Sequence, residues 1–423
     1  MAAIRTQQTV IRHSDPYYGM LDGFCFKAKN LHNCAVYHFR QALFGKAEPT
    51  SYGKLDKQLK TENGGADYRG LPLAWSAQWV IRQVANDFKG YRASCIAYAK
   101  APGKFTGRPR PPGYLDKAKG RQTFQLNIKK IENGRLQFPK TFGGFTLELP
   151  DYVKDIRVVR VVPRNRHVVV EVVYLADVAE VRGDNGLYAG IDLGLDNLAT
   201  VASNTGNPPL LINGKGLKSL NQFWNKRQAH YKSVNDSMNG EWHVTKEGKT
   251  KRAAKSNRET ALANKRNNRV KTFMHQASRK IVDAVAEWGC NTAVIGYNEN
   301  WKRGASMGKA GNQKFVQVPF RHLVSMIKYK AEALGIKVIV TEESYTSKAS
   351  ALHGDFLPTY GESSGQERAF SGRRVSRGLY KSDMGIINAD VNGALNVIRK
   401  AVRDDFSIQR IEGYSNPVSV AVR

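Results

Sequence analysis

Three acidic sites in the second half of the sequence have residue types suited to metal-assisted chemistry. Asp192 ends the apolar segment LYAGIDL and precedes Gly194, where backbone can approach a ligand. Glu342 and Glu343 end the segment IKVIV, and Asp390 begins a helix-like segment, NADVNGALN. Hydrolysis of a phosphodiester needs an activated water and a stabilised leaving oxygen, which two cations about 4 Å apart can supply. Mg²⁺ prefers oxygen ligands, so carboxylates that meet at one sheet edge would suit it.

Each acidic site also has an ordinary structural explanation. Asp390 could cap the start of a helix, and Glu342 and Glu343 could be solvated carboxylates at the end of a strand. Alternation along a strand places Glu342 and Glu343 on opposite faces, so only one of them should reach a metal site. The periodicity does not choose between the two. The case for chemistry therefore depends on the three sites taken together.

A mixed α/β domain beginning near residue 186 would position these carboxylates. The pattern predicts a strand at LYAGIDLG with a hairpin partner at LATVAS, and a short buried strand at TAVIGY. It predicts helices over about 256–288, 319–335 and 387–402, and a strand over 336–345. Strands and helices in this order suit a three-layer domain of RNase H type.

The first half of the sequence predicts a helical module followed by a β-rich module. Apolar residues at three- and four-residue steps favour helices from residue 15 to Leu43 and over about 72–98, after a short strand at 5–13. The segment GRPRPPG breaks the helical pattern, and Asn133-Gly134 is a strong hairpin signal. The runs IRVVRVV and HVVVEVVY favour a second hairpin.

Charge is the main guide to the partners of this chain. Lys and Arg total 66 and Asp and Glu total 36, which gives a formal net charge of +30 at pH 7. So large an excess repels itself within a compact chain unless a polyanion neutralises it. A solvated basic surface is the ordinary alternative. The balance favours a nucleic-acid partner.

Cysteine spacing and hydropathy argue against several other classes. The four cysteines form no CxxC pair, so we expect neither a zinc ribbon nor a disulfide framework: Cys25, Cys34, Cys95 and Cys290. The first residues contain no apolar stretch of the signal-peptide kind, and no run of about 18 apolar residues occurs. We therefore expect no membrane partner and a location in a prokaryotic cytoplasm.

Four ordered motifs resemble those of the TnpB family of transposon-encoded RNA-guided nucleases: GIDLGLDNLAT, VIGYNENWK, TEESYTSK and INADVNGALNVIRKA. Miniature type V CRISPR effectors are similar. The resemblance implies an α/β multidomain fold, in which an RNase H-like RuvC domain follows a β-barrel-like WED module with an inserted helical REC module. The implied domains are a first WED strand at 1–14, REC at 15–100, WED at 101–185 and RuvC at 186–423, in which 346–385 is a zinc-less counterpart of the target-nucleic-acid-binding insert.

The resemblance also assigns the metal ligands, with one departure from the common pattern. Asp192 resembles the first RuvC aspartate and Asp390 the last. Most relatives carry Glu where this chain has Gly296, and one branch of the family uses a relocated glutamate on the following strand. Glu343 is the first choice for that residue, followed by Glu342 and then Glu299. With Asp192, Glu343 and Asp390 as ligands, two Mg²⁺ ions and no zinc are expected.

The partners implied by the resemblance are a guide RNA and a target double-stranded DNA with a short flanking motif. The guide would pair with one DNA strand, while the protein would recognise duplex shape and backbone. Candidate phosphate contacts lie on the helix near 264–271 and in the insert: Lys265, Arg266, Arg269, Lys271, Arg373, Arg374 and Arg377. For each of these charges the ordinary alternative is solvent. The sequence does not fix the oligomeric state.

The leading hypothesis is an RNA-guided DNA endonuclease that hydrolyses target DNA by a two-metal RuvC mechanism. A nuclease-inactive guided DNA-binding repressor is the main alternative, and Gly296 favours it. The retained Asp192 and Asp390, with the pair Glu342 and Glu343, favour the nuclease. A cut-and-paste transposase would not need the two leading modules, and a structural RNA-binding protein would not need the acidic trio.

Overall fold

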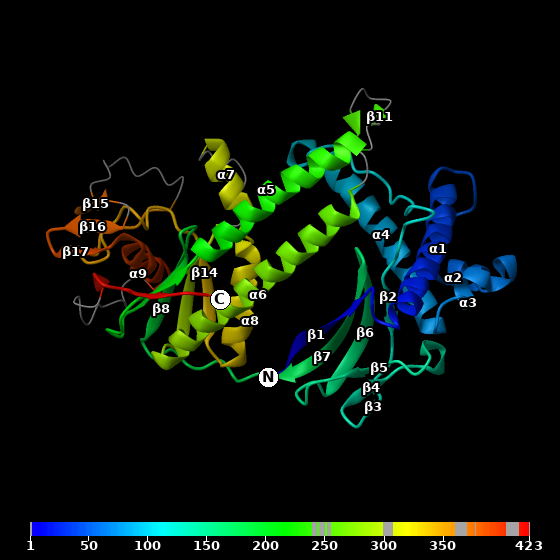
Figure 1. Cartoon of the computed structure of the whole chain (residues 1–423), viewed down its shortest axis with the longest axis horizontal. Helices are drawn as coiled ribbons and strands as arrows, with labels where there is room; N and C mark the ends of the chain where they lie inside the picture. The colour runs from blue at the N-terminus through cyan, green and yellow to red at the C-terminus, as the bar shows by residue number, and fades with distance from the viewer. Residues whose placement is uncertain are drawn as a thin grey trace. The chain divides into compact units, whose positions relative to one another are not determined.

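The computed structural model (Figure 1) has a mixed α/β multidomain fold with two compact units, Ala2–Asp177 and Val178–Arg423. It describes residues 2–238, 243–244, 250–251, 255–298, 308–359, 370–376, 378–402 and 414–422. The two units are described separately below. Within the described residues, no helix has the length and apolarity needed to cross a membrane.

The amino-terminal unit is built on a four-stranded antiparallel sheet in the order β1-β7-β6-β2. The first strand pairs with the last along its whole length, from Ala2 opposite Asp177 to Arg12 opposite His167. The predicted hairpins are confirmed, and Asn133 and Gly134 both take the positive φ that the tight turn requires. The strands are β1 Ala2–Arg12, β2 Phe124–Leu126, β3 Ile131–Glu132, β4 Arg135–Gln137, β5 Thr146–Glu148, β6 Asp155–Arg164 and β7 His167–Asp177.

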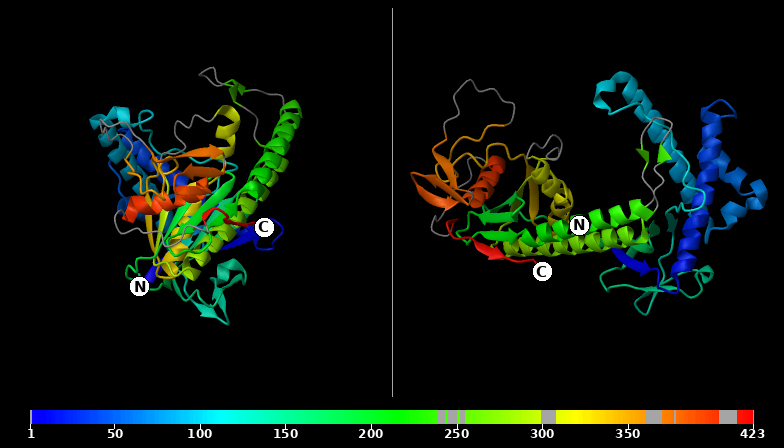
Figure 2. Two further views of the ribbon diagram at one scale, coloured as in Figure 1. Left: turned by 90° about the vertical axis from the view of Figure 1, so that its left-hand side faces the viewer. Right: turned by 45° about the horizontal axis from the view of Figure 1, so that its top comes forward.

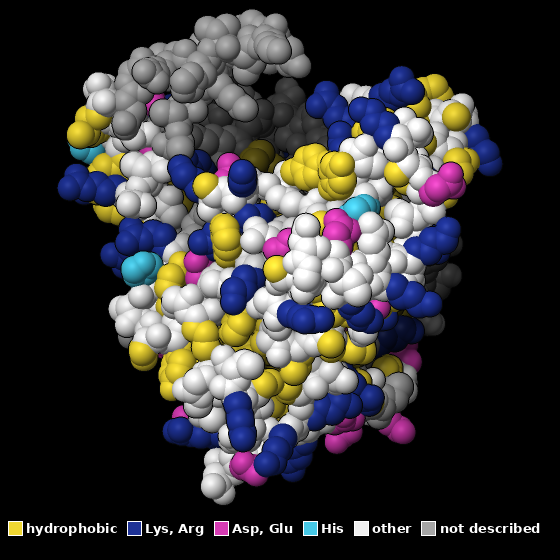
Figure 3. Space-filling model, turned by 90° about the vertical axis from the view of Figure 1, so that its right-hand side faces the viewer, with side chains coloured by type: hydrophobic (Ala, Val, Ile, Leu, Met, Phe, Trp, Pro, Cys, Tyr) yellow, Lys and Arg dark blue, Asp and Glu magenta, His cyan; other side chains and the backbone are white. Residues whose placement is uncertain are grey.

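Two long helices, α1 and α4, pack with this sheet in one continuous core. Buried residues of both helices share that core with Phe124 of β2 and Val170 of β7. The second helix begins two residues after Pro72, because the backbone of Leu73 is still extended. The helical elements are α1 Tyr18–Leu43, α2 Tyr52–Leu59, η1 Glu62–Gly65, α3 Ala66–Arg69, α4 Ala74–Lys100, η2 Pro102–Lys104 and η3 Lys140–Phe142. Basic side chains are scattered among hydrophobic and uncharged ones over the face that Figure 3 presents.

The carboxyl-terminal unit contains a six-stranded mixed sheet in the order β14-β13-β8-β9-β10-β18. Strands β8, β9 and β10 pair antiparallel with one another in sequence order. On the other side of β8, strands β13 and β14 run parallel to it. The sheet therefore places the ends of β8, β13 and β14 along one edge. Its strands are β8 Tyr188–Leu193, β9 Asn197–Ser203, β10 Leu210–Asn213, β13 Thr292–Gly296, β14 Lys337–Thr341 and β18 Val418–Val420.

Helices cover both faces of this sheet (Figures 1 and 2). Ala189, Ile191 and Leu193 pack with the core of α6 and α8 on one face, and Tyr188 packs with α9 on the other. The long helices α5 and α6 lie side by side. The helices are α5 Lys215–Met238, α6 Asn257–Glu287, α7 Gly308–Val316, α8 Phe320–Ala333 and α9 Ala389–Val402.

Several elements were not predicted from the sequence. Among its described residues, α5 buries only Leu217, Asn221 and Asn235. Its apolar periodicity is therefore too weak to predict a helix from the sequence. The strand predicted over 336–345 ends at Thr341, because the chain turns at the two glutamates. The polar segment after it contains a three-stranded sheet of β15 Gly372–Ser376, β16 Leu379–Ser382 and β17 Gly385–Asn388. A further two-stranded sheet joins β11 His243–Val244 and β12 Thr250–Lys251.

Candidate active site

The packing of α9 against β8 positions Asp192. Alternation along β8 puts Gly190 and Asp192 on the α9 face, because Ala189 and Ile191 face the α6 and α8 core. A Cβ at Gly190 would lie 2.0 Å from the carbonyl oxygen of Ala394, so only glycine allows the helix this close to the strand. The close approach brings the Asp192 carboxylate to the first turns of α9.

Asp390 stands in the first turn of α9, but it does not cap the helix. The side-chain oxygen of Asn388 accepts the amide N–H groups of Asp390 and Val391, at 3.0 and 3.2 Å. The capping explanation that the sequence offered for Asp390 is therefore wrong. Its carboxylate accepts a hydrogen bond from Asn197 Nδ2 (2.8 Å) and pairs with Arg374 (3.1 Å).

Glu343 occupies the space that a side chain at position 296 would need. Gly296 ends β13 on the α9 face, and an ideal Cβ there would lie 3.1 Å from Glu343 Oε2 and 3.4 Å from Glu343 Cβ. The same Cβ would lie 2.8 Å from Val397 of α9. The glycine therefore leaves room for a carboxylate that enters from beyond the next strand.

Glu342 points to a different partner, although it is adjacent to Glu343 in sequence. Its carboxylate pairs with Lys400 of α9 and accepts the backbone N–H of Ser344 at 2.9 Å. Burial lowers the pKa of Lys400 to about 8. The Lys400 side chain is only 7% exposed, so this pair fixes the start of the turn to α9. The side chains of Glu342 and Glu343 thus have different surroundings, as strand alternation predicted. They lie in the turn after β14, however, and not within the strand.

Two of the three convergent carboxyl groups have raised pKa values. Burial and, after it, the charge of Asp390 raise the pKa of Asp192 to about 7, although Arg374 acts in the opposite direction. Burial also raises the pKa of Glu343 to about 8, with a second contribution from Asp192. Three carboxylates held in partial burial with mutual repulsion form a site that a cation would stabilise.

A cavity of about 810 Å³ opens in front of Asp192 and Asp390. Both acidic and basic side chains line it. Arg374 extends into it from β15, and Lys215 lies at the start of α5. The other lining residues are Gly194, Leu195, Asp196, Asn197, Thr200, Gly378 and Asn388. A polar cavity lined by both carboxylates and basic side chains suits a phosphate-containing ligand.

The predicted basic residues of α6 fall into two groups. Lys265, Arg269 and Lys271 are exposed. Arg266 instead donates to Asn221 Oδ1 (2.8 Å) and to the carbonyl of Gln317 (3.0 Å), with its guanidinium over the Trp224 ring. The prediction of a phosphate contact at Arg266 is corrected, because these protein contacts already use its donors.

The insert contributes unequally to the site. Arg374 pairs with Asp390, whereas its neighbour Arg373 is exposed. Arg377 lies outside the described residues, and so does Glu299, the third candidate for the missing glutamate.

A buried amide network holds the segment after Glu343 against α9, and sequence reasoning missed it. Asn396 Nδ2 donates to the carbonyls of Thr346 (2.9 Å) and Ala349 (2.7 Å). Asn392 donates to Ala349 and accepts from the amide of Ala351. Both asparagines are fully buried. Two asparagines at i and i+4 on an apolar helix face were the available signal, because a buried amide requires partners.

Two family models match separate parts of this chain. A family described as "Probable transposase" matches residues 167–302, and one described as "Cas12f1-like, TNB domain" matches residues 320–397. The TnpB-like protein ORF457 of Acidianus two-tailed virus is 25% identical over 276 residues, 64% of this chain and 53% of that protein. The matched region thus spans about half of the relative's length.

Two solved structures of CRISPR effectors align with most of this chain. The Cas12f1–sgRNA–target DNA complex aligns over 89% of this chain and 82% of that chain, with 15% identity and a TM-score of 0.49. The mini-RNA-guided endonuclease CRISPR-Cas phi3 aligns over 97% and 94%, with 10% identity and a TM-score of 0.41. Parts of this chain are thus similar to a family of probable transposases, to a Cas12f1-like domain family and to a TnpB-like viral protein.

Proposed function

We propose that this protein is an RNA-guided DNA endonuclease that hydrolyses phosphodiester bonds of target DNA. The convergence of Asp192, Asp390 and Glu343 on the α9 face of one sheet carries the proposal. The net charge of +30 supports a nucleic-acid substrate, because such a chain is stabilised by a polyanion. Similarity to a TnpB-like protein and to a Cas12f1-like domain supports guidance by RNA.

The strand order supports assignment of residues 186–423 to an RNase H-like RuvC domain. An antiparallel β8-β9-β10 group flanked by parallel β13 and β14 is the arrangement expected of that fold. We assign 15–100 to a REC domain and 1–14 with 101–185 to a WED domain. Residues 346–385 would be the insert that contacts target nucleic acid.

Asp192, Asp390 and Glu343 fit a pair of Mg²⁺ ions. Their oxygens are hard ligands, and burial and repulsion raise the pKa of Asp192 and Glu343, an effect that cations would relieve. When bound, the ions would activate a water and stabilise the leaving 3′ oxygen. Asn197 and Arg374 hold the Asp390 carboxylate, and Arg374 at the cavity rim would contact a phosphate oxygen once it leaves Asp390.

A nuclease-inactive guided repressor remains the second candidate, and Gly296 is the observation that favours it. One experiment separates the two. The protein is copurified with RNA from a host that carries its flanking locus, and the RNA is sequenced to define the matched DNA. Cleavage of matched but not unmatched DNA in the presence of Mg²⁺ supports the nuclease. Guided binding with no cleavage under any divalent metal supports the repressor.

Magnesium is expected to stabilise the carboxyl-terminal unit most at alkaline pH. The folded pKa values of about 7 for Asp192 and about 8 for Glu343 exceed ordinary values of about 4. The folded form therefore retains protons that the unfolded chain releases, so the free energy of unfolding without metal falls from about pH 4 to pH 8. Mg²⁺ at a hundred times its Kd should restore about 2.7 kcal/mol at pH 8.

Thermal unfolding at pH 6 and pH 8, with and without Mg²⁺, tests this expectation. Asp192→Asn should flatten the pH dependence, because it removes one buried charge and its repulsion with Asp390 and Glu343. The same variant should lose the Mg²⁺ effect. An equal Mg²⁺ effect in Asp192→Asn would contradict the ligand assignment.

Affinity for guide RNA is expected to fall steeply with salt, and two exposed residues of α6 should contribute to the slope. Six to ten phosphate contacts would lower affinity by about 10³- to 10⁵-fold between 50 and 200 mM salt. The double variant Lys265→Ala, Arg269→Ala should reduce the slope of the logarithm of the binding constant against the logarithm of the salt concentration by roughly 1 to 2. Filter binding across a salt series measures it, and an unchanged slope would remove α6 from the interface.

A further inference from the structure

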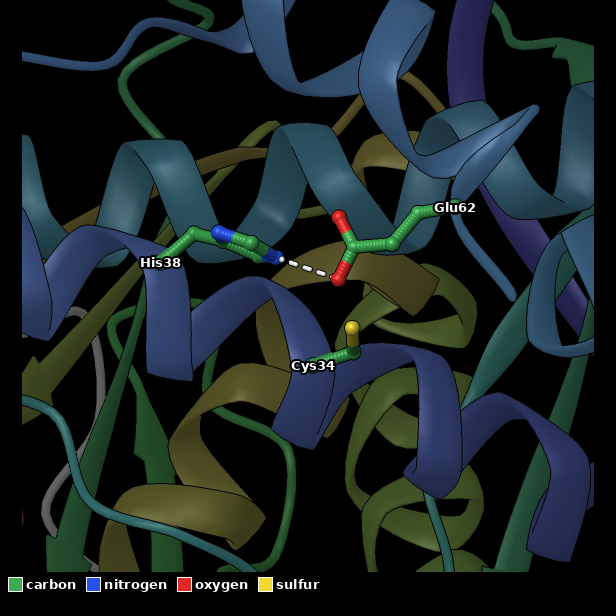
Figure 4. Close-up of side chains that lie close together, drawn as sticks. All are labelled: Cys34, His38 and Glu62. Atoms are coloured by element: carbon green, nitrogen blue, oxygen red, sulfur yellow. Dashed lines mark hydrogen bonds and ion pairs between the residues drawn. The ribbon is translucent and has the colours of Figure 1, made fainter.

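A second group of metal-binding side chains lies in the amino-terminal unit (Figure 4). Cys34 and His38 stand one turn apart on α1, and Glu62 begins the short helix η1 after α2. One donor atom from each of the three lies within 4.8 Å of the other two. His38 Nε2 is already 3.0 Å from Glu62 Oε1.

The chain positions these three donors in advance. The four-residue spacing puts Cys34 and His38 on one side of α1. Gln58 Nε2 donates to the second carboxylate oxygen of Glu62 at 2.9 Å, which orients that group. The turn after Glu62 is tight, since a Cβ at Gly65 would lie 2.4 Å from the carbonyl of Lys60. Glu62 is therefore fixed in front of α1 by contacts unrelated to the two α1 donors.

A basic side chain near this group is already paired with another carboxylate. The nearby Lys60 is paired with Asp56 at 2.6 Å, so its charge is directed to another carboxylate. His38 is 17% exposed and Glu62 29%, which leaves the group open to solvent on one side.

We propose that Cys34, His38 and Glu62 form a mononuclear zinc site that ties α1 to the η1 turn, with water as the fourth ligand. Sulfur, imidazole and carboxylate donors are the set that Zn²⁺ accepts, and its bonds of about 2.0 to 2.3 Å place tetrahedral ligands roughly 3.5 Å apart. The donor atoms lie within 4.8 Å of one another, somewhat wider than that spacing. Binding would release the thiol proton.

The sequence predicted no zinc because it contains no CxxC ribbon. The proposed site does not need that spacing, since two ligands come from a helix at i and i+4 and the third from a distant turn. The proposal is independent of the nuclease assignment. It concerns a different unit and a different metal.

Cobalt substitution provides the direct test. Tag-free full-length protein carrying Asp192→Asn and Asp390→Asn, to remove the carboxylate site, is stripped of metal and titrated with Co²⁺ in excess Mg²⁺. One equivalent should bind and give a thiolate-to-cobalt charge-transfer band, and Zn²⁺ should displace it. Cys34→Ser should abolish the band, and Cys95→Ser, a partly buried cysteine on α4, should retain it.

A conservative variant covers the case in which Cys34→Ser fails to fold. Glu62→Gln keeps a side chain of the same shape and should weaken Zn²⁺ binding at least tenfold in competition with a chromophoric chelator. The circular dichroism spectrum of this variant should match that of the parent. Absence of a charge-transfer band in folded protein, or a band that survives Cys34→Ser, would overturn the proposal and leave His38 and Glu62 as an ion pair.

Discussion

Asp192→Asn and Asp390→Asn are each expected to lower the rate of guided DNA cleavage by roughly a thousandfold, equivalent to about 4 kcal/mol of transition-state stabilisation. Asparagine has nearly the same shape as aspartate but carries no charge. Asp192 is held against α9 through Gly393, whose ideal Cβ would lie 3.1 Å from its carboxylate. The substitution should therefore preserve packing and remove only the charge.

Binding of guide RNA and matched DNA should survive both substitutions. Removal of one acidic charge from a chain of net charge +30 does not weaken its attraction for phosphates. The measurements are single-turnover cleavage rates and equilibrium binding of the same guided complex. Asp283→Asn is a suitable control, because that half-exposed carboxylate on α6 pairs with Arg279 one turn away and does not line the site. Cleavage by Asp192→Asn at the wild-type rate would refute the proposed mechanism.

The elements that position this site were largely predictable from apolar periodicity. The strand that carries Asp192 and the helix that begins near Asp390 both have strong local patterns. The role of Asp390 was less certain from sequence, because aspartate is itself a good helix cap. In the structure the side chain of Asn388, two residues earlier, caps the helix. Which of the two residues caps the helix depends on the backbone geometry of the turn.

Features that depend on contacts between distant segments could not be predicted. Periodicity treated Glu342 and Glu343 as equivalent strand-end carboxylates. Their separation depends on Lys400, a residue nearly sixty positions later, and on the space above Gly296. The buried contacts of Arg266 were hidden for a similar reason, since exposed and buried arginines have the same local sequence pattern. A basic run in sequence does not reveal which donors the protein itself uses.

Exchange of side chains between positions 296 and 343 is expected to show which carboxylate completes the site. Glu343→Ala alone should lower cleavage by about a thousandfold, as for the other two ligands. Gly296→Glu alone should also be severely impaired. Its new side chain would meet Glu343 at 3.1 Å and add a further buried charge beside Asp192.

The double variant Gly296→Glu with Glu343→Ala should recover activity. Removal of the Glu343 side chain empties the space, and a glutamate from the end of β13 can then enter it from the same face of the sheet. Val397 of α9 must still shift, since an ideal Cβ at position 296 lies 2.8 Å from it, so we expect partial rescue of at least tenfold over Glu343→Ala.

The matched control pairs Gly296→Glu with Glu342→Ala. Glu342 is directed to Lys400, so its removal leaves Glu343 in place and should give no rescue. Equal rescue by both double variants would mean that either glutamate can serve. Full activity of Glu343→Ala would exclude Glu343 and direct attention to Glu299. Only a relocated ligand makes the effects of positions 296 and 343 compensate each other, because two independent defects would combine to lower the rate further.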